Sequence, residues 1–181
     1  MTGAVRAVRS RDELIVAPDA VLLAECEVDR YRASGPGGQH RNKTESAIRL
    51  RHASGVTAIA EDSRSQAENK AIALRRLREH LAWERRVPIA LDGYAPSPRL
   101  AALVAGGTAP LGERTRQKPE YLVAMAEMLD LFDALGAEIA ATGQRLGIST
   151  GATSKLLMHD DRVARTANTL RTKRGLRPMR A

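Results

Sequence analysis

Alternating polar and apolar side chains predict strands in the first third of the chain. Residues 25–32 alternate in character, and residues 46–60 alternate on both sides of the turn-forming pair Ser54-Gly55. Successive side chains of a strand point to opposite faces, so this period of two predicts one strand followed by a hairpin. Residues 33–44 hold Gly, Ser, Pro and Asn without a hydrophobic period, which predicts a long loop between strand and hairpin.

Helical patterns flank these strands. Residues 12–25 predict one or two short helices, with Pro18 at a helix N-terminus. After the hairpin, Ser63 or Ser65 can cap a longer helix that stops before Pro88. Its apolar positions recur at helical spacing: Ala67, Ala71, Leu74, Leu77 and Leu81. Its other face is predicted to be basic: Arg64, Lys70, Arg75, Arg76, Arg78, Arg85 and Arg86.

The second half of the chain is predicted to be helical after a linker. Residues 87–119 contain five of the eight prolines and four of the glycines, and therefore indicate a Pro/Gly linker. Four helices are predicted at about 120–136, 138–146, 149–158 and 160–174.

The expected fold class is α+β. A small domain with a mixed or antiparallel sheet and a packed long helix precedes a small all-α, helix-turn-helix-like domain. The predicted organisation is a flexible N-terminus over 1–11, an α+β domain over 12–87, a linker over 88–119, a helical domain over 120–175, and a basic tail over 171–181.

The helical domain contains a candidate helix-turn-helix. Gly147 would form the turn, Ser149 would cap the second helix, and Gly143 would allow the helices to approach closely. The exposed face of the second helix is predicted to hold Thr150, Thr153, Ser154 and Lys155. Such a helix can read DNA, contact RNA or the ribosome, or simply pack. Residues 121–161 hold 2 basic and 6 acidic side chains, which argues against strong duplex DNA binding.

Composition excludes several classes of protein. Aromatic residues make up only 3% of the 181 residues, which disfavours a module that stacks single-stranded bases. Cys26 is the only cysteine, so no internal disulfide or thiolate metal site is expected. His159 beside Asp160 and Asp161 is expected to be a solvated helix start, so no metal is predicted. No apolar run approaches the roughly 20 residues of a membrane span, and no signal peptide is recognisable.

The charge distribution points to a polyanionic partner. The net charge is +8. Residues 30–86 carry 13 basic and 6 acidic side chains, and residues 162–181 carry 7 basic and no acidic ones. Basic charge segregated into two blocks favours nucleic acid over general solubility.

The predicted loop carries the candidate chemistry. In Gly35-Pro36-Gly37-Gly38-Gln39, two successive glycines permit backbone angles closed to other residues and allow close approach to a ligand. Backbone N–H groups aimed at a reacting ester can stabilise a developing oxyanion, without a carboxylate pair or a Ser/His/Asp set. The surrounding cationic groups are suited to RNA phosphates: Arg32, His40, Arg41 and Lys43.

These residues resemble a known family. The string RASGPGGQHRNK from Arg32 to Lys43, followed by SAIRL from Ser46 to Leu50, resembles the GGQ domain of bacterial class I peptide chain release factors. The resemblance covers about residues 22–86. It continues through Gly55-Val56, Arg64-Ser65-Gln66 and Asn69-Lys70.

The resemblance implies a cytoplasmic, cofactor-free hydrolase. Its partners would be peptidyl-tRNA and the rRNA of the ribosomal peptidyl-transferase centre, and a monomer is expected. By this resemblance Gln39 acts through its backbone N–H and side chain, while Gly37 and Gly38 supply the backbone conformation. Further residues would shape the loop (Gly35, Pro36 and Asn42), and others would contact rRNA or brace the loop (Arg64, Gln66 and Asn69).

The chain also departs from the family pattern. Only about 30 residues precede the loop, so a codon-reading domain is not expected there, and the chain resembles short, codon-independent ribosome-rescue hydrolases. Those proteins end in a flexible basic tail, whereas an ordered helical region is predicted here. Its tail is expected to contact rRNA phosphates through Arg171, Lys173, Arg174, Arg177 and Arg180. Two alternatives remain: a DNA-binding helix-turn-helix regulator, and a non-catalytic ribosome-associated factor.

Overall fold

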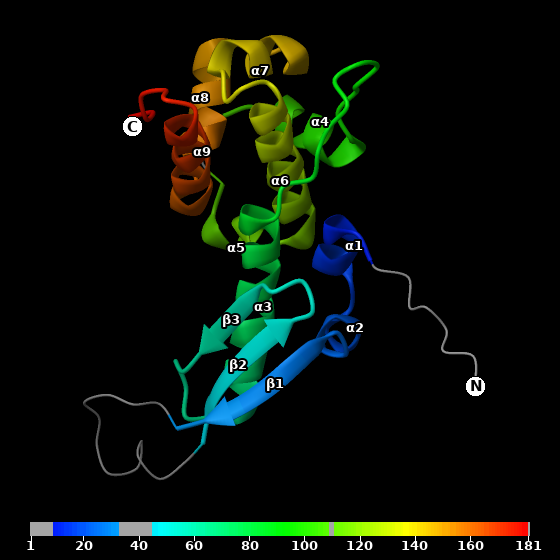
Figure 1. Ribbon diagram of the computed structural model, residues 1–181, viewed down its shortest axis with the longest axis vertical. Helices are drawn as coiled ribbons and strands as arrows, with labels where there is room; N and C mark the ends of the chain where they lie inside the picture. Colours follow the sequence, from blue (N-terminus) through cyan, green and yellow to red (C-terminus); the bar gives the residue numbers. More distant parts are fainter. Residues whose placement is uncertain (1–8, 33–44, 109–110, 181) are drawn as a thin grey trace.

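The computed structural model describes residues 9–32, 45–108 and 111–180. The molecule is elongated, with a small sheet at one end and a group of helices at the other (Figure 1). The sheet contains β1 (Cys26–Tyr31), β2 (Ala47–His52) and β3 (Thr57–Ala60) in the order β1-β2-β3. Both strand pairs are antiparallel. The predicted α+β class, the first strand and the hairpin are therefore confirmed.

Two short helices precede the sheet, as predicted. They are α1 (Arg11–Val16) and α2 (Asp19–Leu23), and Pro18 is the N-cap residue of α2. Ser10 and Glu13 form a reciprocal capping box that fixes the start of α1.

The long helix α3 (Gln66–Glu84) joins the two ends of the molecule. Ser65, rather than Ser63, caps it, because the Ser65 hydroxyl accepts a hydrogen bond from the Glu68 N–H. It packs on β2 and β3, and it also contacts α1, α6 and α9. Leu74, Leu77 and Leu81 form its buried side, as the helical period predicted, whereas Ala67 and Ala71, predicted for the same face, are exposed.

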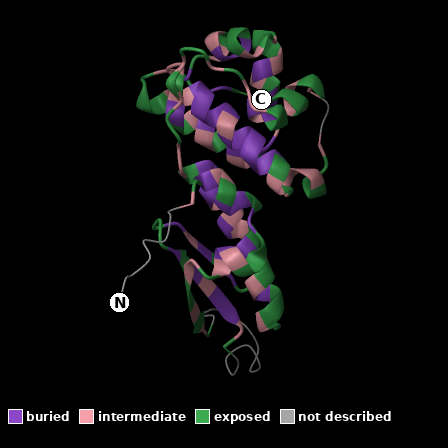
Figure 2. Ribbon diagram, turned by 90° about the vertical axis from the view of Figure 1, so that its right-hand side faces the viewer, coloured by how far each residue is buried: buried purple, intermediate pink, exposed green. Residues whose placement is uncertain are grey.

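Six helices among the described residues form the helical end. They are α4 (Pro98–Ala105), α5 (Glu113–Arg116), α6 (Pro119–Ala134), α7 (Ile139–Leu146), α8 (Thr150–Met158) and α9 (Asp161–Lys173). The four helices from α6 to α9 agree with the sequence prediction. Figure 2 shows α6 as the most continuously buried helix of this end.

The predicted linker needs correction, because it contains α4 and α5. The Ser97 hydroxyl caps α4, Pro98 occupies its first turn, and the fully buried Leu100 packs it toward α6. The eight-residue helix was hidden by the surrounding prolines and glycines. One continuous hydrophobic core runs from Leu50 under the sheet to Phe132 and Leu170, so the division into two domains remains a prediction.

A buried ion cluster joins the sheet end to the helical end. Asp130 of α6 is 3% exposed and accepts from Arg11 at 2.6 Å and from Arg86 at 2.7 Å. Arg11, itself 2% exposed, also donates to the backbone carbonyl of Arg85. Arg86 was predicted to lie on the basic face of the long helix. This prediction is wrong, because the charge of Arg86 is used inside the molecule.

A second ion cluster lies between α3 and α9. Arg162 pairs with Glu79 of α3 at 2.7 Å and forms a two-pronged contact with Asp160. Two more cations of the predicted basic face are also engaged: Arg78 binds Asp19 and two carbonyls, and Arg76 binds Asp62. The two clusters hold the helices against α3 as a fixed extension of the sheet end.

The predicted helix-turn-helix geometry is present. Gly147 ends α7 with φ 69°, and the Ser149 hydroxyl caps α8. A Cβ on Gly143 would lie 2.6 Å from Thr153 Oγ1, so glycine is needed for this close approach. Thr153 was predicted to be exposed, but it is fully buried because it faces Gly143 and donates to the Ser149 carbonyl.

Candidate functional site

The candidate catalytic loop spans residues outside those that the structure describes. These residues are Gly35, Pro36, Gly37, Gly38, Gln39, His40, Arg41, Asn42 and Lys43. The structure does show how both ends of the loop are held. Tyr31 at the end of β1 pairs with Ala47 at the start of β2. The two strand ends therefore meet at one edge of the sheet, at the opposite end of the molecule from α7 and α8 (Figure 1).

Asn69 fastens the point where the loop rejoins the sheet. Its side-chain amide donates to the carbonyl of Ser46 at 2.7 Å and to the carbonyl of Ser63 at 2.8 Å. Its side-chain oxygen accepts from the Ser63 N–H at 2.9 Å. Asn69 is fully buried, so these three bonds replace contacts with water. This one residue ties the start of β2 to the turn before α3.

Two weaker contacts reinforce the same corner. Gln66 donates to the Glu45 carbonyl at 3.1 Å, and the side chains of Glu45 and Arg32 pair at 3.5 Å. Arg32 and Glu45 are both more than half exposed, so their pair contributes little to stability. Gln66 is thus placed to brace the loop, which is one of the two roles predicted for it beside rRNA contact. Arg64 is exposed and forms no ion pair with the described residues.

The open face of the sheet carries balanced charge. Asp29 of β1 binds Arg49 at 2.9 Å and Arg51 at 3.1 Å. The hydrogen bond from Arg49, aided by Arg51, holds the pKa of Asp29 below its usual range. Arg49 also lies 6.0 Å from the centre of the Tyr31 ring. Arg49 and Arg51 are paired, whereas four other cations of this end have no acidic partner among the described residues: Arg30 of β1, Arg64 before α3, and Lys70 and Arg75 of α3.

A family comparison bears on this end of the molecule. A family model described as the RF-1 domain matches residues 20–89. The matched range contains the sheet, the whole loop and all of α3. Residues 20–89 are an RF-1 domain.

The curated relatives that this chain matches are peptide chain release factors. The chain is 51% identical over 61 residues to peptide chain release factor 1 of Ureaplasma parvum, a match that covers 33% of this chain and 17% of the relative. It is 54% identical over 59 residues to peptide chain release factor 2 of Acidithiobacillus ferrooxidans, covering 32% and 16%. It is 40% identical over 103 residues to peptide chain release factor 2 of Corynebacterium aurimucosum, covering 56% and 25%. The matches thus span a quarter or less of these relatives.

The cations predicted in the C-terminal tail fall into two groups. Arg171 donates to the carbonyls of Ala137 and Arg177, and Arg174 pairs with Asp133. These two hold the tail and α9 to the helical end, which the sequence did not reveal because their partners include backbone carbonyls. Lys173 and Arg177 are exposed, and their side chains have no partner among the described residues.

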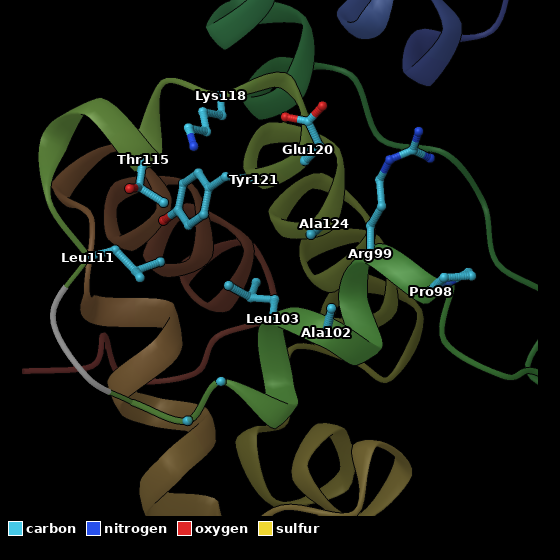
Figure 3. A pocket seen from close by; sticks show the side chains of 12 residues that line it. Pro98, Arg99, Ala102, Leu103, Leu111, Thr115, Lys118, Glu120, Tyr121 and Ala124 are labelled. Atoms are coloured by element: carbon cyan, nitrogen blue, oxygen red, sulfur yellow. The ribbon is translucent and has the colours of Figure 1, made fainter.

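Outside the RF-1 domain, α4, α5 and α6 surround a cavity of about 480 Å³. Its walls are mainly apolar, formed by Leu103, Leu111 and the ring of Tyr121. Figure 3 shows Lys118 reaching over the Tyr121 ring, whereas Arg99 and Glu120 extend away from the ring. Burial, together with Asp160, strongly raises the pKa of Tyr121. Beside these apolar walls, the lining also includes the Thr115 hydroxyl and the charged side chains of Lys118 and Glu120.

Residues 9–32, 45–108 and 111–180 contain no group of three His, Cys, Asp or Glu side chains arranged to hold a metal ion. No helix within those same ranges combines the length and apolar character needed to cross a membrane.

Proposed function

We propose that this protein hydrolyses the ester bond of peptidyl-tRNA on the ribosome. The observation that supports this most strongly is the RF-1 domain over residues 20–89, within which the Gly-Gly-Gln loop is anchored at its exit by the buried Asn69. The partners would be the rRNA of the peptidyl-transferase centre and the peptidyl-tRNA. The protein would act in the cytoplasm, as a monomer and without a cofactor.

The proposed reaction is attack of water on the ester carbonyl carbon. The bond from that carbon to the tRNA 3′ oxygen breaks, the nascent peptide leaves as an acid, and the tRNA regains its hydroxyl. The Gln39 N–H would stabilise the charge that develops on oxygen, and Gly37 and Gly38 would allow the backbone to present it. The Gln39 side chain would help to place the water, so the loop needs no titratable catalytic group.

We further propose that release is codon-independent and serves the rescue of stalled ribosomes. The rigid connection between the two ends of the molecule supports this. The clusters around Asp130 and Arg162 fix the helical end on α3. With the two ends held together in this way, the loop would be presented in the same manner whichever codon lies in the A site.

The decisive experiment uses ribosomes stalled with a labelled peptidyl-tRNA. The full chain is added to complexes with an empty A site, with a sense codon, or with a stop codon there. Release of labelled peptide at similar rates from all three supports codon-independent hydrolysis. Release with a stop codon alone contradicts the rescue proposal, and binding without release favours the non-catalytic alternative.

The helix-turn-helix geometry keeps one other candidate function open. Thr150 and Lys155 are exposed at the start and middle of α8, where a recognition helix would present its side chains. A DNA-binding regulator would bind one duplex sequence far more tightly than others. Selection of bound fragments from random duplex DNA tests this, and enrichment of a defined sequence would favour the regulator.

A further inference from the structure

The last twenty residues carry seven cations, and the structure separates them by role. Arg162, Arg171 and Arg174 are used inside the molecule, in the contacts to Glu79, Ala137 and Asp133. The other four side chains are exposed and have no acidic partner among the described residues: Arg165, Lys173, Arg177 and Arg180. These four form the part of the segment that is free to meet a polyanion.

The C-terminal tail folds back beside α9. Asn168 accepts from the Met179 N–H at 2.7 Å and donates to the Met179 carbonyl at 3.2 Å. Arg171 donates to the Arg177 carbonyl at 2.7 Å. The tail therefore runs antiparallel to the helix and brings Arg180 back to the level of Asn168. We call α9 together with residues 174–180 the α9–tail surface.

Two cations and two hydroxyls share one side of this surface. Arg165, Thr169, Thr172 and Lys173 line a shallow groove with Asn168. The spacing of four, seven and eight residues from Arg165 places all of them on one face of the helix. Since the tail is fastened to Asn168, the cations Arg177 and Arg180 lie beside the same groove.

The two threonine hydroxyls use their hydrogens inside the helix and present acceptors to the groove. The Thr169 hydroxyl donates to the Arg165 carbonyl at 2.8 Å, and the Thr172 hydroxyl donates to the Asn168 carbonyl at 2.9 Å. Each hydroxyl has one hydrogen, so its exposed oxygen is left with lone pairs alone. Phosphate oxygens, which need donors, cannot use them. A ribose 2′-hydroxyl can donate to them, and this group is absent from DNA.

The surface also lacks the means to bind unpaired bases. Residues 133–181 contain no Phe, Trp or Tyr, so bases have no aromatic ring on which to stack. Cations for phosphates combined with acceptors for 2′-hydroxyls match the backbone and minor groove of an RNA helix. The chemistry favours duplex RNA over single strands and over DNA.

We propose that the α9–tail surface docks on a helical segment of ribosomal RNA. The choice of ribosomal RNA rests on the proposed function, whereas preference for an RNA helix follows from the side chains alone. Because α3 and its ion clusters fix this surface relative to the sheet, docking there would set where the loop is delivered. Asn168 and Arg171 are positioning residues, since their side chains are engaged in holding the tail.

The experiment measures binding of the full-length protein to a short RNA duplex over a range of salt concentrations. The same sequence as DNA, its single strands, tRNA and purified ribosomal subunits are compared. R165Q/K173Q removes two groove cations, and R99Q/R114Q removes two exposed cations from α4 and α5 as the matched control. T169V/T172V removes the acceptors with little change of shape, and Asn168→Ala releases the tail.

The expected results differ between variants. R165Q/K173Q lowers affinity for the RNA duplex roughly tenfold and reduces the slope of log affinity against log salt by roughly 2, about one for each lost phosphate contact. R99Q/R114Q leaves that slope nearly unchanged. T169V/T172V keeps the slope but loses the preference for RNA over DNA. Asn168→Ala speeds amide exchange in the tail and weakens RNA binding to the level of R177Q/R180Q.

Several outcomes overturn the proposal. Equal affinity of R165Q/K173Q and the control for the RNA duplex would contradict the proposed phosphate contacts. Equal affinity of the wild type for RNA and DNA would contradict the proposed 2′-hydroxyl contacts. Binding to tRNA but not to either ribosomal subunit contradicts the ribosomal source. If these binding results hold while stalled ribosomes release no peptide, the proposed hydrolysis fails and the RNA-docking surface stands.

Discussion

The side-chain amide of Asn69 donates a 2.7 Å hydrogen bond to the backbone carbonyl of Ser46, where the candidate catalytic loop rejoins the sheet. The same side chain satisfies both backbone groups of Ser63. A residue of α3 thereby fixes the start of β2 and the turn before the helix at once. We expect the position of the loop to depend on this contact.

Asn69→Ala should destabilise the protein and slow release. The substitution leaves three backbone groups in this buried corner without their partner, at a cost of about 2–4 kcal/mol. Gln66→Ala, which removes one half-exposed hydrogen bond to Glu45, is the matched control and should cost about 0.5–1 kcal/mol. Urea unfolding measures both. Equal stability of the two variants would mean that Asn69 does not carry the anchor.

Asp130→Asn tests the junction between the sheet end and the helical end. Asparagine keeps the shape but leaves the guanidinium groups of Arg11 and Arg86 buried without a counter-charge, which should cost about 3–5 kcal/mol. Asp133→Asn breaks a more exposed pair with Arg174 and should cost less than about 1 kcal/mol. Thermal unfolding of both variants provides the comparison, and a small effect at Asp130 would contradict the fixed junction.

Gly143→Ala tests the close contact of α7 and α8. The added Cβ would lie 2.6 Å from Thr153 Oγ1 and 2.8 Å from the Ile148 carbonyl oxygen. This overpacking should cost about 1–3 kcal/mol. Gly151→Ala on α8 is the control, because only the Ser149 hydroxyl lies near, at 3.9 Å. The greater helix propensity of alanine at position 151 should stabilise the protein by up to about 1 kcal/mol. A neutral Gly143→Ala would show that the two helices can move apart freely.

Asp160 should make stability sensitive to acid. Burial alone would raise the pKa of this carboxyl, but its hydrogen bonds to Arg162 and the charge of Arg116 outweigh burial and lower the pKa. A carboxyl whose pKa is lowered on folding contributes its full stability above its unfolded pKa of about 3.9 and loses it as pH falls through the folded value.

Asp160→Asn retains a capping side chain for α9, so the helix start is conserved. The free energy of unfolding of the wild type should therefore fall more steeply than that of Asp160→Asn as the pH drops below about 4. Urea titrations at several pH values measure this. Parallel pH profiles would show that Asp160 is not held ionised by Arg162.

Local signals predicted much of this fold. Alternation identified β1 and the β2–β3 hairpin, and capping and turn residues located Ser149 and Gly147 in the helix-turn-helix. The missed features depend on distant partners. Arg86 resembled a surface cation because Asp130, its counter-charge, lies 44 residues away. Arg171 resembled an RNA contact because its acceptors are backbone carbonyls, which no sequence pattern identifies.

The candidate site shows the same division. The loop motif and its resemblance identified the RF-1 domain, which the family match over residues 20–89 supports. The α4 helix was hidden because Pro98 and Gly106 at its ends resemble linker residues, yet here they start and end a helix. The role of Asn168 was also missed, since nothing near it in sequence indicates that the chain returns to it at Met179.

Gly38→Ala tests the proposed hydrolysis most directly, because it restricts the backbone of the loop. A substitution of Gln39 is less direct, since the proposed backbone N–H of that residue would remain. The rate of peptide release is measured on stalled ribosomes at saturating protein, with ribosome binding measured in parallel. We predict that binding is retained while release slows by roughly 100-fold, the usual cost of losing one oxyanion-stabilising donor. Release by Gly38→Ala at the wild-type rate would contradict the assignment of this loop as the hydrolytic centre.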